Sequence, residues 1–219
     1  QQRFRLHYQI APDRPVALSV GRAAHEKNID FLIDAVHQVR LRHPELILLI
    51  AGEGPALSRL QEYARALEMG ESVRFIGYLD RGRELPDCYA AADLFVFASR
   101  TETQGLVLLE AMAAGLPVVA LAEMGTRDIL VEESGALAPP DRLDAFASAI
   151  SQVLEDPALR TRMRQQGKRW AANWSDESLT ARLAELYRQI VATHPVPNAH
   201  GKSIQRKDRP DPPVERPAL

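Results

Sequence analysis

Two positively charged residues follow the first apolar run of the chain, and their types suit a phosphorylated ligand. Arg22 comes just after Val16–Val20, and Lys27 stands directly before the next amphipathic segment. Two cations at the carboxyl end of a strand can neutralise a diphosphate without a metal ion. From spacing alone, a pair of solvated loop charges is the more frequent explanation of such residues.

A second group of residues couples two carboxylates to the start of a helix. A polar loop with Glu102 leads through Gly105 into an apolar helical segment that carries Glu110. The backbone amides of Gly105, Leu106 and Val107 would lack partners at that helix start, which makes them a ready anion site. Glu110 is costly among apolar residues unless donors reach it, and the vicinal diol of a ribose offers two. At helical rise eight residues span about 12 Å, so the carboxylates fit two ends of one ligand, and unrelated loop and helix glutamates fit equally well.

The glycines after the second apolar run form an incomplete dinucleotide-binding motif. Gly52-Glu53-Gly54-Pro55 begins as G-x-G-x-x-G does, but Leu57 stands where the third glycine belongs. The motif also follows the second strand and not the first, which counts against a standard NAD domain. The glycines allow a ligand or another backbone to approach closely, and a tight turn before a helix explains them equally well.

Composition narrows the class of protein. The chain has 219 residues, with 27 Lys and Arg against 29 Asp and Glu, and a formal net charge of −2. That balance argues against a nucleic-acid partner, since nucleic-acid-binding domains normally present a net basic face. The single cysteine, Cys88, excludes an internal disulfide and a multi-cysteine metal site. Because Leu46–Ala51, the longest apolar run, is far too short to span a bilayer, we expect a cytoplasmic protein.

Short apolar runs alternate with amphipathic segments, and this alternation predicts an α/β fold. Runs that are apolar on both faces are typical of buried parallel strands. Helical spacing predicts helices over 29–39, with Asn28 as the cap, and over 57–67. We therefore expect a Rossmann-like parallel sheet with helices on both faces and ligands beyond the carboxyl ends of its strands. The expected strands are Val16–Val20, Leu46–Ala51, Val73–Ile76, Leu94–Ala98 and Pro117–Leu121.

The two ends of the chain differ from this alternating region. Residues 1–14 show no clean period and predict a linker, whereas residues 15–193 predict the folded domain. After Pro140, helices are expected over 141–155, 157–170 and 175–192, the last opened by Ser175. Residues 194–219 are rich in proline and charge and predict a disordered tail. Its basic residues fit a solvated tail better than a contact with acidic lipid at a membrane: Lys202, Arg206, Lys207 and Arg209.

Several motifs stand in an order that is characteristic of one enzyme family. Glu102-x7-Glu110 continues into EAMAAGLPVVA, and GR-x4-K runs from Gly21 to Lys27. LILLIAGEGP, VRFIGYL and YAAADLFVFAS lie between them. The chain thereby resembles, from roughly Val16 to Val191, the C-terminal donor-binding domain of the family-four (group 1) retaining glycosyltransferases of the GT-B fold. The resemblance implies transfer of a hexosyl group from a nucleotide-sugar, foremost a UDP-sugar, to an acceptor held by a missing N-terminal domain.

The resemblance also implies a role for each matching residue. Arg22 and Lys27 would hold the diphosphate, together with the amides of Gly105, Leu106 and Val107. Glu110 would bind the ribose hydroxyls, and Glu102 would contact the transferred sugar near the reacting carbon. No metal or other cofactor is expected in this family. The remaining implied donor-binding residues are Gly54 beside the pyrophosphate, Gly77 and Tyr78 beside the base, and Gln104 beside the sugar.

One departure from the family pattern bears on the acceptor. Many relatives have an aromatic residue before the glycine where this chain has Gln104. The form TETQGL resembles the branch that glucosylates diacylglycerol and related lipids, which modestly favours a lipid-linked acceptor and a peripheral position on the inner face of a membrane. Two alternatives remain open: a nucleotide-sugar epimerase of the same fold, and a non-catalytic nucleotide-sugar-binding module. Without its N-terminal domain, we expect the isolated chain to be inactive and to expose an apolar stripe on its last helix, which favours self-association.

Overall fold

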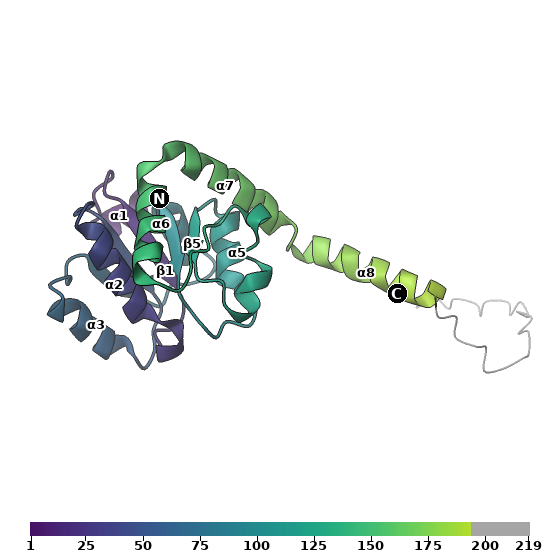
Figure 1. The fold of residues 1–219 in the computed structure, drawn as a ribbon, viewed down its shortest axis with the longest axis horizontal. Coiled ribbons are helices and arrows are strands. Elements are labelled where there is room, and N and C mark those ends of the chain that lie inside the picture. Colours follow the sequence, from purple (N-terminus) through teal and green to yellow (C-terminus); the bar gives the residue numbers. More distant parts are fainter. Residues whose placement is uncertain (194–219) are drawn as a thin grey trace, which may run out of the picture. The chain divides into compact units, whose positions relative to one another are not determined.

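The computed structural model describes residues 1–193, and the expected disordered tail, residues 194–219, lies outside the described residues (Figure 1). The chain divides into two units, of which the first runs from Gln1 to Leu179 and the second begins at Thr180. The sheet, its covering helices and all of the expected site residues belong to the first unit.

Five parallel strands form the sheet of the first unit in the order β3-β2-β1-β4-β5. This arrangement confirms the predicted α/β, Rossmann-like fold. The order changes direction between β1 and β4, because the chain adds β2 and β3 on one side of β1 and then returns to its other side. Such a switch point opens a crevice at the carboxyl ends of the strands. The strands are β1 (Val16–Val20), β2 (Ile47–Ala51), β3 (Val73–Gly77), β4 (Leu94–Phe97) and β5 (Val118–Ala120).

Two hydrophobic cores lie on opposite faces of the sheet, and successive strand residues alternate between them. Leu48 and Ile50 of β2 belong to the first core, and Ile47 and Leu49 to the second, so both faces of the strand are buried. This burial explains why the strands are uniformly apolar in sequence. The first core includes α2 (Ile29–Arg40), α3 (Leu57–Ala66) and α6 (Leu143–Glu155), and the second includes α1 (Gln2–His7), α4 (Glu84–Ala91) and α5 (Leu106–Ala113).

Apart from α8 (Asp176–Thr193), the remaining elements of the described residues are one long helix and three short 3-10 helices. Helix α7 (Pro157–Ala172) packs on α5, and Asp156 caps its start by accepting from the amide of Leu159 at 2.9 Å. The 3-10 helices lie in loops that follow β1 or β5: η1 (His25–Lys27), η2 (Met124–Asp128) and η3 (Glu132–Ser134).

The first fourteen residues are part of the folded unit, which corrects the prediction that they form a linker. They contain α1, with Phe4 and Arg5 buried, and Ile10 is buried behind it. The guanidinium of Arg5 forms an ion pair with Asp93 at 2.9 Å and donates to the carbonyl of Ala91 at 2.9 Å. The same group donates to three carbonyls of the following loop, at Ala11, Pro12 and Arg14. A single buried cation therefore fastens this segment to the sheet.

The residues at the starts of two helices differ in whether their side chains make a capping hydrogen bond. Asn28 occupies the N-cap position of α2 as predicted, but its backbone is left-handed at φ 53° and its side chain makes no capping bond. Its Nδ2 atom is buried without a partner within the described part of the chain. Ser175 behaves as expected, since its Oγ accepts from the amide of Ser178 at 3.2 Å.

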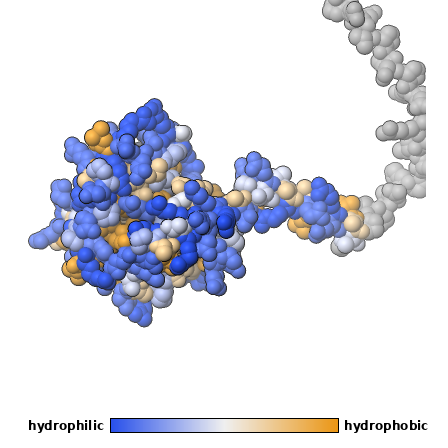
Figure 2. Space-filling model, turned by 90° about the horizontal axis from the view of Figure 1, so that it is seen from above, coloured by the Kyte–Doolittle hydropathy of each residue, from blue (hydrophilic) through white to orange (hydrophobic). Residues whose placement is uncertain are grey.

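Helix α8 (Asp176–Thr193) carries the second unit's described residues. Leu183, Leu186 and Ile190 share one face of the helix and are exposed, and apolar residues are visible along it in Figure 2. Self-association through this face stays a prediction. Within residues 1–193, no helix is both long and apolar enough to cross a membrane.

Candidate functional site

Two residues that are distant in sequence meet at the carboxyl edge of the sheet. The Nζ atom of Lys27 lies 2.6 Å from Oε2 of Glu102, although the two residues are 75 positions apart. Lys27 ends the loop after β1 and Glu102 lies in the loop after β4, so their contact crosses the switch point. Both side chains are about one-fifth exposed, at 22% and 21%, so they remain within reach of a ligand.

Backbone contacts hold these two loops together. The hydroxyl of Ser99, which is fully buried, donates to the carbonyl of Glu26 at 3.3 Å. On the other side of the loop, the amide of Gly125 donates to the carbonyl of Glu102 at 2.9 Å. A Cβ atom on Gly125 would overlap the carbonyl of Thr103, so only glycine fits there. Gly125 has no signature in the sequence, because a close approach between two loops leaves no local pattern.

The start of α5 is the place where anion-binding amides were predicted. Gly105 is its N-cap residue, with a left-handed backbone at φ 63°, and no side chain in the described structure caps the helix. The amides of Leu106 and Val107 lie in the first turn, where helical hydrogen bonding leaves donors unpaired. A helix of eight residues also directs its positive dipole end to this point. The arrangement therefore suits a phosphate group.

Glu110 lies one turn further along α5 and has its own partners. Its Oε2 atom accepts from the hydroxyl of Tyr89 at 2.9 Å, and its Oε1 atom is 3.9 Å from a guanidinium nitrogen of Arg81. These three residues line a cleft of about 510 Å³ together with Leu85 and Ala114. Burial, and after it the neighbouring Glu110 carboxylate, raise the pKa of Tyr89 above its usual value, so its hydroxyl stays protonated. Tyr89 was not singled out as a site residue from the sequence, because a tyrosine in an apolar segment usually belongs to the core.

A neighbouring cleft contains the residues expected near the diphosphate and the base. It has a volume of about 290 Å³, and its lining includes Arg22, Glu53 and Tyr78. Arg81 and Leu85 line this cleft and also the one beside Glu110, so the two adjoin. Tyr78 is 69% exposed, next to Gly77 in a left-handed conformation at φ 71°. A ligand that extends through both clefts would contact Arg22 and Glu110 at once.

The glycines of the incomplete dinucleotide motif serve the packing of two loops. A Cβ on Gly52 would overlap the carbonyl of Gly21, and one on Gly54 would overlap that of Ala23. The amide of Ala23 donates to the carbonyl of Glu53 at 3.0 Å, which joins the loops after β1 and β2. Close packing of backbone therefore accounts for Gly54, and its expected contact with the pyrophosphate remains untested.

The other expected residues divide into two separate groups. Lys27 and Glu102 form one pair, whereas Glu110 pairs with Tyr89 on the second core side of the sheet. The two carboxylates thus have different partners, and their contact with two parts of one ligand stays a prediction. Gln104 lies exposed in the loop between Glu102 and Gly105. Within residues 1–193, no three His, Cys, Asp or Glu side chains are grouped so that they could hold a metal ion, and the expectation of a metal-free site stays a prediction.

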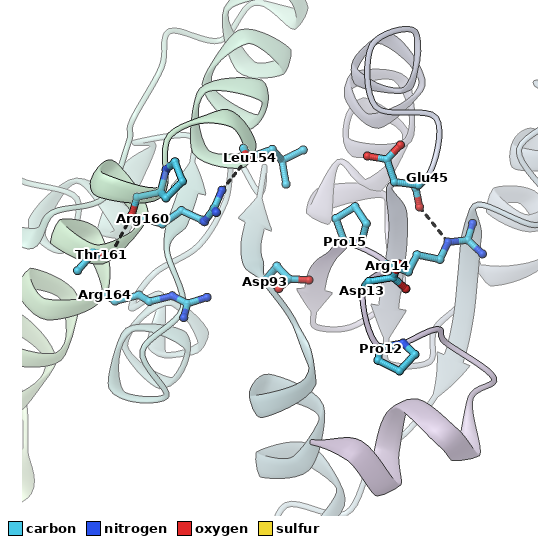
Figure 3. A pocket seen from close by; sticks show the side chains of 11 residues that line it. Pro12, Asp13, Arg14, Pro15, Glu45, Asp93, Leu154, Arg160, Thr161 and Arg164 are labelled. Carbon is cyan, nitrogen blue, oxygen red and sulfur yellow. Dashed lines mark hydrogen bonds between the residues drawn. The ribbon is translucent and has the colours of Figure 1, made fainter.

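The amino edge of the sheet has a larger cleft of about 530 Å³ (Figure 3). Arg14 donates from there to the carbonyl of Glu45 at 2.9 Å, and Arg160 donates to that of Leu154 at 2.5 Å. Asp93, also in its lining, accepts from Arg5 and from the amide of Val16. These charged groups are engaged in holding the protein's own loops, so we place the functional site at the carboxyl edge.

The fold, with its candidate site at the carboxyl edge of the sheet, defines a Rossmann-like domain of the kind found in GT-B glycosyltransferases. The chain matches the family Glycosyl transferases group 1 over residues 1–170, and it belongs to that family.

Relatives of known activity and solved structures agree with this membership. A GDP-mannose-dependent alpha-(1-6)-phosphatidylinositol monomannoside mannosyltransferase of Mycolicibacterium smegmatis is 36% identical over 193 residues, which cover 84% of this chain and 50% of the relative. An alpha-D-kanosaminyltransferase of Streptomyces kanamyceticus is 33% identical, over 81% of this chain and 46% of the relative. A sucrose-phosphate synthase structure from Thermosynechococcus elongatus has a TM-score of 0.75 at 30% identity, over 89% of this chain and 50% of that one. The chain therefore spans about half the length of the relatives that it matches.

Proposed function

We propose that this chain is the donor-binding half of a retaining glycosyltransferase that moves a hexosyl group from a nucleotide-sugar to an acceptor. The observation that carries the proposal is the Lys27–Glu102 contact at the switch point, beside the unpaired amides of α5. At this edge, a cation and a helix start suit the diphosphate of a sugar diphosphate, and a carboxylate suits the hydroxyls of its sugar. Family membership supports the same chemistry.

Catalysis in this proposal consists mainly of stabilising the leaving group. The bond between the sugar C1 and the diphosphate oxygen breaks, and negative charge grows on the diphosphate while the acceptor oxygen bonds to C1. The proton of the acceptor hydroxyl passes to the departing diphosphate. In this proposal Arg22, Lys27 and the amides of Gly105–Val107 stabilise that charge; the position of Arg22 and Lys27 after β1 and of the amides at the start of α5 supports it. Glu102 would exchange its contact with Lys27 for the hydroxyls of the transferred sugar, close to the reacting carbon.

The nucleoside part would lie in the two adjoining clefts. Glu110 would accept from the ribose hydroxyls, and the base would lie against Gly77 and Tyr78, with Gly54 on the pyrophosphate side. We propose a UDP-sugar as the donor, which the resemblance to the family favours. A GDP-sugar is the second candidate, because the Mycolicibacterium relative is described as GDP-mannose-dependent.

The acceptor would be bound by a further domain, and a lipid-linked acceptor is proposed. The chain covers only half of the relatives' length, which leaves room in the complete proteins for acceptor recognition. The relatives include enzymes named for a phosphatidylinositol mannoside and for lipopolysaccharide core synthesis. Gln104 would offer its amide to a sugar hydroxyl. With such an acceptor, the enzyme would work in the cytoplasm at the membrane's inner face.

The test is a calorimetric titration of the chain with UDP, GDP and ADP, followed by the matching hexose conjugates. We expect saturable binding of one nucleotide and its loss in Glu110→Ala, while Glu62→Ala, an exposed glutamate of α3, serves as the matched control. A well-folded chain that binds none of the three would contradict the donor role. Retention is tested separately, by the anomeric configuration of the product formed by the complete enzyme, and an inverted linkage would overturn that part.

A further inference from the structure

A tyrosine of α4 makes a hydrogen bond with the carboxylate that we assign to the ribose. Tyr89 donates from its hydroxyl to Oε2 of Glu110 at 2.9 Å. The tyrosine itself is buried, with 4% exposure, and its ring lies 6.0 Å from that of Phe95. The glutamate side chain is 34% exposed and lines the cleft. A rigid buried donor therefore holds a carboxylate that faces the solvent.

The two oxygens of this carboxylate differ in what they can still accept. Oε2 is engaged by Tyr89, whereas Oε1 has Arg81 at 3.9 Å, which is beyond hydrogen-bond distance. The Arg81 side chain is 76% exposed and can move aside at little cost. A donor that enters the cleft can thus reach Oε1 without breaking a hydrogen bond.

We propose that Tyr89 is a positioning residue for the ribose site, which fixes the Glu110 carboxylate in the orientation that accepts a vicinal diol. The inference rests on the proposed donor function. A free glutamate side chain samples several rotamers, and binding must order it, which weakens affinity. Tyr89 removes this cost in advance, because its ring is packed in the core and its hydroxyl already donates to Oε2 of Glu110.

Burial also keeps Tyr89 in its donating form. The raised pKa of this tyrosine means that its proton is retained at every pH at which the enzyme would be assayed. The hydroxyl therefore cannot become a second negative charge beside Glu110. A substitution that removes only this hydroxyl tests the contact without opening a cavity.

The experiment compares Tyr89→Phe with the unchanged chain by calorimetry. The ligands are whichever of UDP, GDP and ADP binds most tightly, and its 2′,3′-dideoxy analogue, which lacks both ribose hydroxyls. We expect affinity for the ribonucleotide to fall about tenfold, and affinity for the analogue to change less than twofold. The preference for ribose, expressed as the ratio of the two affinities, should therefore fall about tenfold.

A matched control is available in another part of the molecule. Tyr63 donates to Oδ1 of Asp34 at 2.7 Å between α3 and α2. Tyr63→Phe removes a similar hydrogen bond and should leave both affinities unchanged. A second hydroxyl-free variant, Tyr89→Leu, should lower the ribose preference as Tyr89→Phe does, which guards against an effect peculiar to one replacement.

Three outcomes would distinguish an error in the role of Tyr89 from an error in the proposed donor function. A wild-type ribose preference in Tyr89→Phe, combined with a lost preference in Glu110→Ala, would overturn the role of Tyr89 alone. A wild-type preference in Glu110→Ala would overturn the ribose site. Absence of nucleotide binding by the unchanged, folded chain would overturn the donor function and the inference together.

Discussion

The two edges of the sheet use their charged side chains in opposite ways. At the amino edge, arginines bond to backbone carbonyls: Arg5 reaches four of them, and Arg14 and Arg160 cap the ends of neighbouring loops. At the carboxyl edge, Lys27 pairs with Glu102 and Tyr89 with Glu110. A carbonyl is fixed by the fold, whereas a side-chain partner can rotate away when a ligand arrives.

Charged side chains at the amino edge therefore stabilise the fold, whereas those at the carboxyl edge can exchange a partner within the protein for a ligand. Removing a cation at the amino edge leaves buried carbonyl groups without donors, and that loss falls on stability. Removing a cation at the carboxyl edge leaves a partly exposed carboxylate that water can solvate. The stability of the fold then changes little, and ligand binding is weakened instead.

Lys27→Ala should have the largest effect. It should slow sugar transfer without destabilising the fold. In the complete enzyme we expect the rate of sugar transfer to fall about 10²- to 10³-fold, because the leaving diphosphate loses a cation. The free energy of unfolding should change by less than about 1 kcal/mol, since the ion pair is partly exposed. The control is Arg59→Ala, which removes an exposed ion pair with Asp30 and should alter neither quantity appreciably. Near-normal transfer by Lys27→Ala would remove this residue from the mechanism.

Arg5→Met should show the opposite behaviour. We expect the free energy of unfolding to fall by about 3 kcal/mol, because Asp93 and several carbonyls lose their donor, as measured by urea denaturation. Nucleotide affinity of the folded fraction should stay the same. Arg3→Met, on the same helix but with an exposed arginine side chain paired to Asp87, should cost less than about 1 kcal/mol. If the two variants were equally stable, the amino edge would not depend on Arg5.

Gly125→Ala tests the loop contact that positions Glu102. The new methyl group would overlap the carbonyl of Thr103, so the two loops must separate, and we expect a stability loss of about 2 kcal/mol together with reduced transfer. The matched control is Gly70→Ala, where the nearest atom to the new Cβ is the Arg65 Cγ at 3.7 Å. Thermal unfolding and a transfer assay measure both effects. Wild-type behaviour of Gly125→Ala would mean that the loop position is not required.

The smallest expected effect uses Cys88 as a reporter of stability. Burial raises the pKa of this thiol to about 12, so at pH 8 only about one molecule in 10⁴ would carry the reactive thiolate. A thiol reagent should therefore label the native chain slowly and the unfolded chain at once. We expect Arg5→Met to accelerate labelling and Lys27→Ala to leave it unchanged. Equal labelling rates would contradict the division between the two edges.

The strands were predictable because both of their faces are buried, and so they are apolar in sequence. Helices α1 and α4 were not foreseen, since each is short and α4 contains Pro86 in its first turn. The residues 1–14 have no clean period, and their order depends on Arg5, whose partners at Ala91 and Asp93 are remote in sequence. A tertiary contact of this kind is invisible to local patterns.

A candidate site could be proposed from the sequence where residue type alone suggested the chemistry. Lys27, Glu102 and Glu110 are charged groups next to strand or helix ends, and such positions attract attention in any sequence. Tyr89 and Gly125 act through contacts with Glu110 and Glu102, and neither contact has a local signature. Supporting residues are therefore the part of this site that requires a structure.

The separation of 75 residues between Lys27 and Glu102 has a consequence for how the molecule acquires its activity. Closing so long a loop carries an entropic cost, so contacts of this type form after local structure. During synthesis, the segment up to β3 can be complete while half of the site is still absent. A nucleotide-sugar that binds as proposed recognises only the finished fold and shifts the population toward it. Cellular donor concentration would then govern the lifetime of the enzyme as well as its rate.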